Sequence, residues 1–237
     1  MRIGMLTPSS NTVLEPLTVE MLASLKGSVT AHFSRFRVTA ISTDQTSRAQ
    51  FDTGPMLAAA GLLADAKVDV IVWNGTSGGW EGIERDVELA HEIEHETGIP
   101  ATTGTLGTVD AFKALGIRRY GLVVPYVDDI RDAITATFGK LGFECVAHTN
   151  ESVETNWDFS QISPLTVAQR CRTVAQAKPD AVLIFCTNLA GAGVVDQMER
   201  ELGMPVLDSV VISLWAAFHR VGSSARIPGY GKLLENV

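Results

Sequence analysis

The sequence predicts an α/β protein of two similar lobes. Each lobe is expected to be a parallel sheet flanked by helices, and a pseudo-twofold axis relates the two, with the site between them. Short β-branched apolar runs alternate with stretches of helical period, and the same order of motifs occurs once in each half of the chain. The 237 residues, 46% hydrophobic and 19% charged, suffice to bury such a core without disulfides.

Four apolar runs predict buried strands, because β-branched residues bounded by turn-forming residues favour strands that are covered on both faces. These runs are residues 3–6, 68–73, 120–124 and 181–185. Apolar residues spaced three and four apart predict helices at residues 56–66, 83–97, 127–141 and 166–178. Helices that connect successive strands favour parallel pairing in both lobes.

Three pairs of matched residues indicate an internal duplication. The pairs are Gly4 with Gly121, Asp69 with Asp180 and Gly98 with Gly203, at offsets of 117, 111 and 105 residues. The second offset pairs Gly75 with Cys186. We therefore expect a first lobe of residues 1–108, completed by 209–237, and a second lobe of residues 109–208.

Composition excludes several classes of protein. The chain has 19 Lys and Arg against 27 Asp and Glu, a net charge of −8, and no basic run longer than Arg118-Arg119, so nucleic acid is not an expected partner. No apolar run is long enough to span a membrane. The three cysteines form no C-x-x-C pair, which favours a reducing cytoplasm over a disulfide framework. The composition is compatible with a homo-oligomer.

Small hydroxyl and amide side chains follow the predicted strands, where ligands of parallel sheets bind. They are Ser9, Asn11, Thr76 and Ser77 in the first lobe, and Thr187 and Asn188 in the second. Gly75, Tyr126 and Cys186 stand at the same strand ends. Because no carboxylate or histidine is among them, we expect an anion pocket in which N–H and O–H donors bind a small carboxylate or dicarboxylate.

Neither a metal nor a dinucleotide is expected. His91 and His95 satisfy the H-E-x-x-H pattern of zinc proteases, but a helical projection places both on the face opposite the apolar residues, toward solvent. Gly191-x-Gly193 has Asp196 where the dinucleotide fingerprint requires its third glycine.

A serine hydrolase is an alternative. Residues 75–79 satisfy the G-x-S-x-G pattern of a nucleophile elbow after a strand and before a helix. Ser77, Asp208 and His219 would follow the chain order of hydrolase triads. The duplication argues against this alternative, because it pairs Ser77 with Asn188 and so favours a shared binding loop.

Cys186 is the candidate for chemistry. It follows an apolar strand, and a helix is expected to begin at Thr187 or Asn188. The N-terminus of a helix stabilises a thiolate, so the pKa of Cys186 is expected to be lowered, which suits an acid, a base or a nucleophile. Cys145 and Cys171 have no such position and are expected to be structural.

Four segments carry a family resemblance: PSSNT at 8–12, TLGTVDA at 105–111, PY at 125–126 and CTNL at 186–189. With them the chain resembles the aspartate/glutamate racemase superfamily, in the branch of maleate cis-trans isomerase and arylmalonate decarboxylase. The resemblance implies a cofactor-free, two-lobed enzyme that binds a small carboxylate between the lobes and transfers protons with cysteine.

Members with two cysteines carry one at the end of each symmetry-related strand, whereas Gly75 stands at the first position here. That departure is similar to arylmalonate decarboxylase. It implies decarboxylation of a malonate-type, 2-substituted and optionally aryl dicarboxylic acid through an enediolate that Cys186 protonates. One donor suffices, because decarboxylation generates its own carbanion. The substrate-binding residues implied are Ser9, Asn11, Gly75, Thr76, Ser77, Tyr126, Asn156, Thr187 and Asn188.

Other functions stay open on the same residues. They are a maleate-type cis-trans isomerase, a racemase of a small carboxylate, and a non-catalytic carboxylate-binding protein that has lost one cysteine. Trp73, Trp80 and Trp157 either line the pocket or fill the core. If the pocket holds an enediolate, Gly75→Cys is expected to restore the second base and confer racemisation.

Overall fold

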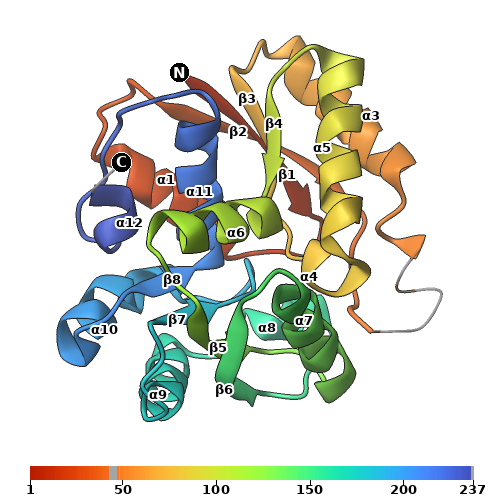
Figure 1. Ribbon diagram of the computed structural model, residues 1–237. Coiled ribbons are helices and arrows are strands. Elements are labelled where there is room, and N and C mark those ends of the chain that lie inside the picture. The colour runs from red at the N-terminus through yellow and green to blue at the C-terminus, as the bar shows by residue number, and fades with distance from the viewer. Residues whose placement is uncertain (43–46, 48, 236–237) are drawn as a thin grey trace.

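The computed structural model describes residues 1–42, 47 and 49–235 and confirms the predicted fold class. It contains two four-stranded parallel sheets flanked by helices (Figure 1). The first sheet has the order β2 (Thr30–Phe36), β1 (Arg2–Pro8), β3 (Val70–Trp73), β4 (Ala101–Thr103). The second has the order β6 (Glu144–Asn150), β5 (Arg119–Val124), β7 (Ala181–Ile184), β8 (Val206–Asp208).

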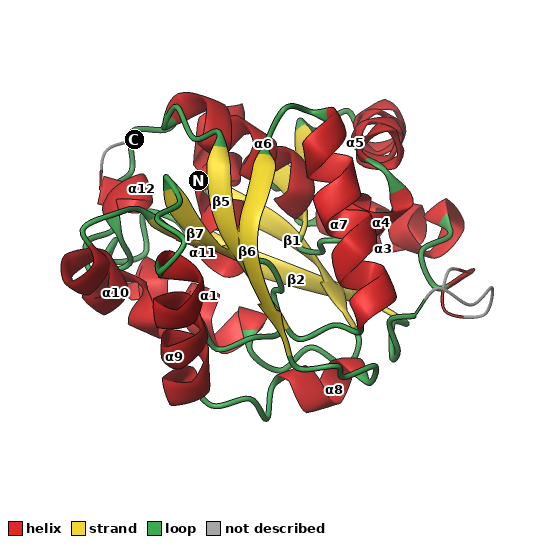
Figure 2. Ribbon diagram, turned by 60° about the horizontal axis from the view of Figure 1, so that its bottom comes forward, coloured by secondary structure: helices red, strands yellow, loops and turns green. Residues whose placement is uncertain are grey.

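The helices lie on the outer faces of the sheets and between the lobes (Figure 2). In the first half they are α1 (Leu14–Ala23), α3 (Thr53–Asp65), α4 (Gly78–Glu81), α5 (Ile83–Thr97) and α6 (Gly104–Ala114). In the second half they are α7 (Asp128–Lys140), α8 (Asn156–Phe159), α9 (Pro164–Ala175), a 3-10 turn (Ala192–Val194), α10 (Val195–Leu202), α11 (Ser209–Arg220) and α12 (Lys232–Glu235). Among the residues described, no helix is both long and apolar enough to cross a bilayer.

The four predicted strands are the central strands of the two sheets, and the four that the sequence did not predict are the edges. Each central strand has a partner on both sides and is almost entirely buried, which gives the continuous apolar run that was recognised. The edge strands β2 and β6 carry polar, half-exposed residues. The edge strands β4 and β8 have three residues each.

Strand register confirms the duplication residue by residue. Gly4 pairs with Ile71 in the first sheet, and Gly121 pairs with Val182 in the second, which reproduces the offsets of 117 (121 − 4) and 111 (182 − 71). The offset of 105 recurs in the edge strands. Gly75 and Cys186 therefore occupy equivalent positions, two residues beyond the ends of β3 and β7.

The matched glycines Gly98 and Gly203 have the same backbone role. They end α5 and α10 with φ of +68° and +67°, the left-handed conformation that closes a helix and that glycine adopts without steric cost. Each is followed by a short edge strand, so the chain turns in the same way in both lobes.

The helices that follow the edge strands β4 and β8 each begin with a side-chain cap. The hydroxyl of Thr103 accepts a hydrogen bond from the amide of Leu106 at the start of α6. The carboxylate of Asp208 accepts hydrogen bonds from the amides of Val210 and Val211 at the start of α11. Helix α11 follows the second sheet but packs against α6 and the first sheet, and residues 209–218 are all buried. The boundary expected between residues 108 and 109 lies within α6.

Candidate active site

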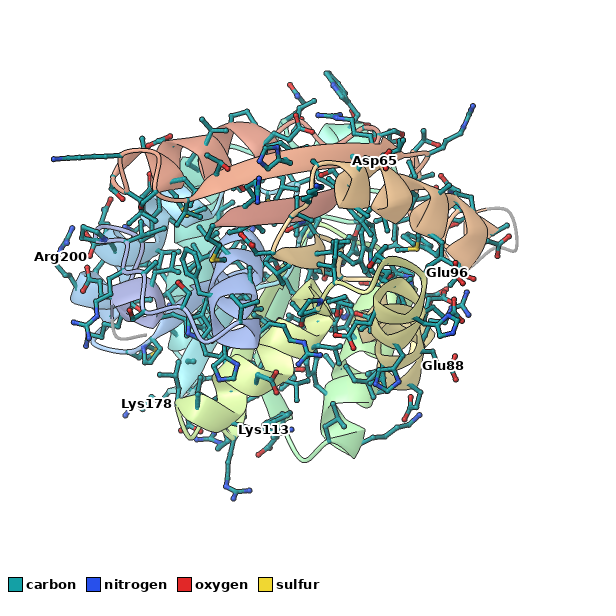
Figure 3. The ribbon with its side chains drawn as sticks, turned by 90° about the horizontal axis from the view of Figure 1, so that it is seen from above. Asp65, Glu88, Glu96, Lys113, Lys178 and Arg200 are labelled. Atoms are coloured by element: carbon teal, nitrogen blue, oxygen red, sulfur yellow. The ribbon has the colours of Figure 1, made fainter. Side chains whose placement is uncertain are left out.

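A small cavity lies where the loops after β1, β3, β5 and β7 meet, between the lobes. Its lining residues are Pro8, Val38, Ile41, Phe51, Trp73, Gly75, Thr76, Trp80, Tyr126, Asn156, Cys186 and Thr187. None of these described residues is charged. The charged side chains of Asp65, Glu88 and Lys113 lie at the periphery of the molecule (Figure 3). The free volume of about 20 Å³ is close to the space that one water molecule needs.

Cys186 is the single cysteine among the described residues that line this cavity, and it is 2% exposed. Its Sγ accepts a hydrogen bond from the amide of Asn188 at 3.4 Å, and the hydroxyl of Tyr126 is near enough to the thiol to favour the thiolate. Burial raises the pKa of the thiol to about 12, although these two neighbours lower it. The thiol therefore stays protonated at neutral pH.

The expectation of a lowered pKa for Cys186 was wrong for two reasons. No helix begins directly after it, because residues 187–190 form turns and bends, and α10 starts only at Val195. The site also lies inside the protein, where the free-energy cost of removing a thiolate from water exceeds the stabilisation that nearby N–H groups give it.

Tyr126 connects the two lobes beside this thiol. Its hydroxyl lies 2.8 Å from the hydroxyl of Thr76, and burial raises its pKa well above the ordinary value. The ring makes edge contacts with Trp80 and Phe159, each with ring centroids 5.3 Å apart. Thr76, Tyr126 and Cys186 thus form a row of neutral polar groups across the cleft.

A second set of polar residues holds the lobes together around the cavity. The hydroxyl of Thr187 donates to the carbonyl of Asn74 at 3.0 Å and accepts from the amide group of Asn11 at 3.2 Å. The Oδ1 of Asn188 accepts from the amide of Thr12 at 3.0 Å, while its Nδ2 donates to the carbonyl of Asn156 at 2.5 Å. These contacts fix the positions of the loops after β1 and β7.

Six of the ten predicted site residues line the cavity: Gly75, Thr76, Tyr126, Asn156, Cys186 and Thr187. The other four, Ser9, Asn11, Ser77 and Asn188, do not line it, and their polar atoms bind the protein itself. Ser9 is exposed and pairs with the backbone of Val38, and Ser77 accepts a hydrogen bond from the indole of Trp73 at 3.2 Å.

The sequence did not predict the apolar wall of the cavity. Val38, Ile41 and Phe51 come from the segment between β2 and α3, where apolar residues are indistinguishable from core. Trp73 and Trp80 also line the cavity, whereas Trp157 is 50% exposed and does not. Phe51 and Trp80 meet edge to face at 5.8 Å between ring centroids. The cavity lining therefore combines polar groups with apolar and aromatic ones.

Two buried carboxyl groups support the loops behind the cavity. Asp86, in α5, accepts a hydrogen bond from Thr103 at 2.5 Å and lies against Gly78; burial raises its pKa to about 6. Burial raises the pKa of Asp208 to about 7, and its Oδ2 has no hydrogen-bond partner among the residues that the structure describes. Neither carboxyl lines the cavity.

The hydrolase triad does not form. Asp208 caps the start of α11 and His219 stands in its last turn, so eleven residues of helix separate the two by about 16 Å. The imidazole of His219 stacks on Trp215, and the hydroxyl of Ser77 is bound to Trp73. The H-E-x-x-H residues His91 and His95 lie on the exposed face of α5.

Comparison with known proteins shows the family to which this chain is related. A family model described as arylmalonate decarboxylase matches residues 27–234. Arylmalonate decarboxylase of Bordetella bronchiseptica is 26% identical over 159 residues, which are 66% of each chain, and maleate isomerase of Nocardia farcinica is 25% identical over 99% of this chain and 95% of that one.

Solved structures agree on the fold. Maleate isomerase of Pseudomonas putida S16, solved with maleate, superimposes with a TM-score of 0.91 at 22% identity over 100% of this chain and 98% of that one. Arylmalonate decarboxylase superimposes with a TM-score of 0.82 at 22% identity over 99% of each chain. The likeness covers both lobes. This chain belongs to the arylmalonate decarboxylase family, and its relatives include both decarboxylases and maleate isomerases.

Proposed function

We propose that this protein is a cofactor-independent decarboxylase of a malonate-type, 2-substituted dicarboxylic acid. The observation that carries the proposal is an asymmetry between equivalent positions. Cys186 brings one protonated thiol to the cavity, and the equivalent position in the first lobe is Gly75. A site with one proton donor suits a reaction that generates its own carbanion.

The polar row supplies the groups that the reaction needs. One carboxylate of the substrate would accept hydrogen bonds from Thr76, Tyr126 and the amides near Cys186. When the other carboxylate leaves as CO₂, the electron pair of the broken C–C bond moves into the retained carboxylate and forms an enediolate. Donors that are already oriented stabilise that charge, by about 3 to 4 kcal/mol for each donor.

Cys186 would then complete the reaction. Its S–H proton moves to the α-carbon, a C–H bond forms, and the thiolate left behind recovers a proton from water after the product departs. The raised pKa of the thiol keeps this proton in place before the reaction. The enediolate is a strong base, so it takes the proton even from a weakly acidic thiol.

The apolar residues of the cavity lining favour a hydrophobic 2-substituent. Val38, Ile41 and Phe51 have purely apolar side chains, and Trp80 adds an aromatic ring. Because the free volume is close to that of one water molecule, binding must widen the cavity.

Maleate isomerisation is the second candidate. Two observations favour it: the maleate isomerase relatives align over 99% or more of this chain, and their fold superimposes with TM-scores up to 0.91. Isomerisation of maleate needs rotation about its C=C bond, which a covalent bond from a cysteine permits. In the Nocardia farcinica isomerase the succinylcysteine intermediate forms in a mutant that has serine in place of one cysteine, and therefore on a cysteine other than the one replaced. The cavity here has one thiol among the described residues, and for that reason we rank isomerisation second.

A substrate panel tests the proposal. The protein is incubated in D₂O with phenylmalonate, methylmalonate, 2-methyl-2-phenylmalonate, maleate and several amino acids, while CO₂ release and α-deuteration are followed. We expect CO₂ from at least one 2-substituted malonate, and deuterium on a single face of the product of 2-methyl-2-phenylmalonate. Conversion of maleate to fumarate without CO₂ release would select the isomerase. Binding of these acids without turnover of any would indicate a carboxylate-binding protein.

A further inference from the structure

The two lobes differ at the last residue of the equivalent strands β3 and β7. Trp73 ends β3 and Ile184 ends β7, and strand register makes them equivalent, since Leu6 pairs with Trp73 and Val123 pairs with Ile184. Two residues further on, Gly75 is the equivalent of Cys186. A large residue therefore precedes the glycine, and a smaller one precedes the cysteine.

The indole of Trp73 fills the place of a side chain at position 75. A Cβ built on Gly75 would lie 2.0 Å from Cζ2 and 2.3 Å from Cε2 of this indole, far inside the closest approach of real atoms. The ring is fully buried, its Nε1 donates to the Oγ of Ser77 at 3.2 Å, and it packs on Phe36 with ring centroids 5.0 Å apart. A rigid, hydrogen-bonded ring in this setting cannot give way cheaply.

Ile184 leaves the corresponding space open in the second lobe. Its Cγ2 and Cδ1 lie beside Gly191, at 3.0 and 3.1 Å from the position of a Cβ on that residue, and Ile184 does not line the cavity. The thiol of Cys186 therefore reaches the cavity without obstruction. In the first lobe the large side chain belongs to Trp73 and position 75 has none, so the indole fills the space that a cysteine side chain at position 75 would need.

We propose that Trp73 is a specificity-determining residue that makes the site one-sided. It occupies the acid–base position of the first lobe and covers that face of the substrate with an aromatic ring whose single N–H is bound to Ser77. This inference rests on the proposed function for its catalytic meaning. It changes the expectation for Gly75→Cys, because the new side chain has no room while Trp73 is present.

A double-mutant cycle in thermal stability tests, without any substrate, whether Trp73 fills the side-chain space at position 75. The variants are Gly75→Ala, Trp73→Ile and the double variant, and their Tm values are measured by circular dichroism. The backbone of Gly75 has no positive φ, and the three atoms nearest to a Cβ at this position all belong to Trp73, so we expect the contact with Trp73 to dominate the penalty for alanine. We expect Gly75→Ala to lower Tm by about 4 to 10 °C in the wild type, and to cost little or even raise Tm in the Trp73→Ile background.

Gly139→Ala is the matched control, because nothing lies within 4 Å of a Cβ at that position in α7. It is expected to change Tm equally in both backgrounds. Equal losses from Gly75→Ala in both backgrounds, or no loss in either, would overturn the assignment of Trp73.

A second arm tests the catalytic part. The variant Trp73→Ile with Gly75→Cys reproduces in the first lobe the pair that the second lobe has in Ile184 and Cys186. Under reducing conditions in D₂O, it is given enantiopure 2-phenylpropanoate, and deuteration and loss of optical purity are followed. We expect exchange at least tenfold faster than in the wild type or in Gly75→Cys alone, and we expect it to vanish when Cys186→Ala is added.

The two arms separate the possible failures. Coupling in Tm without a gain of exchange, in a protein that decarboxylates a malonate, would overturn the catalytic role of Trp73. Coupling in Tm in a wild-type protein that decarboxylates no malonate would support the steric assignment and would count against the proposed function alone.

Discussion

The hydroxyl of Tyr126, from the loop after β5, lies 2.8 Å from the hydroxyl of Thr76, from the loop after β3. The same Tyr126 hydroxyl lies beside the thiol of Cys186, and the two groups affect each other's pKa. Each lobe therefore supplies part of one row of donors, and neither lobe contains a complete site. The duplication has produced a cleft whose two sides are similar in backbone and different in chemistry.

Replacing Cys186 with alanine is expected to lower kcat by about 100- to 10,000-fold, because the reaction loses its proton donor. Binding of a malonate and the far-UV spectrum should change little, since alanine keeps the backbone of the loop. Cys145→Ala is the control, as this cysteine is half-buried on β6 and does not line the cavity. Turnover by Cys186→Ala close to the wild-type rate would contradict the role given to the thiol.

Tyr126→Phe removes one hydroxyl and keeps the ring between Trp80 and Phe159. We expect kcat to fall about 100-fold or more, because an oriented donor to the enediolate is lost, while Tm changes by no more than about 4 °C. The matched variant is Tyr120→Phe, at a buried tyrosine that does not line the cavity, and it should retain full activity. Equal kinetic losses in the two variants would mean that packing, and not hydrogen bonding, is responsible.

Alkylation of Cys186 by iodoacetamide should be slow at pH 7 and accelerate about tenfold for each pH unit up to pH 10. The reason is that only the thiolate reacts, and burial raises the pKa of this thiol to about 12. Inactivation rates at several pH values, with mass spectrometry to locate the label, provide the measurement. A bound carboxylate such as phenylacetate should protect the site. A rate that levels off below pH 9 would reveal an ordinary or lowered pKa.

Asp208→Asn should flatten the dependence of stability on pH. The folded protein holds the pKa of Asp208 at about 7, above its usual 3.8, so the native state binds this proton more tightly than the unfolded chain does. Stability from this group is complete below about pH 4 and falls as pH rises toward 7. Asparagine keeps an oxygen to cap α11 and cannot ionise.

Urea unfolding at pH 5 and pH 8 measures this effect. Relative to the wild type, Asp208→Asn should gain about 2 to 3 kcal/mol in the free energy of unfolding between these pH values. Asp86, whose pKa is raised to about 6, adds a smaller trend in the same direction in both proteins and cancels in the comparison. Parallel pH profiles for the two proteins would show that Asp208 is ionised in the folded state at pH 5 as well as at pH 8.

The sequence by itself determined the central strands, the duplication and the position of Cys186. Strands β1, β3, β5 and β7 are covered on both faces, so most of their residues must be apolar. This requirement appears in the sequence as a continuous run of apolar residues. The repeat predicted that Gly75 and Cys186 are equivalent because the spacing of residues along a chain is preserved when a duplicated unit folds twice.

Only the tertiary structure decided the chemistry around these positions. The pKa of Cys186 depends on how deeply the whole protein buries it, and sequence proximity to a strand end does not reveal that depth. Ser77 and Asn188 belong to the predicted set, yet their polar atoms bind Trp73, Thr12 and Asn156. The indole of Trp73 covers Gly75 because of its side-chain orientation within the packed core, which no spacing of residues specifies.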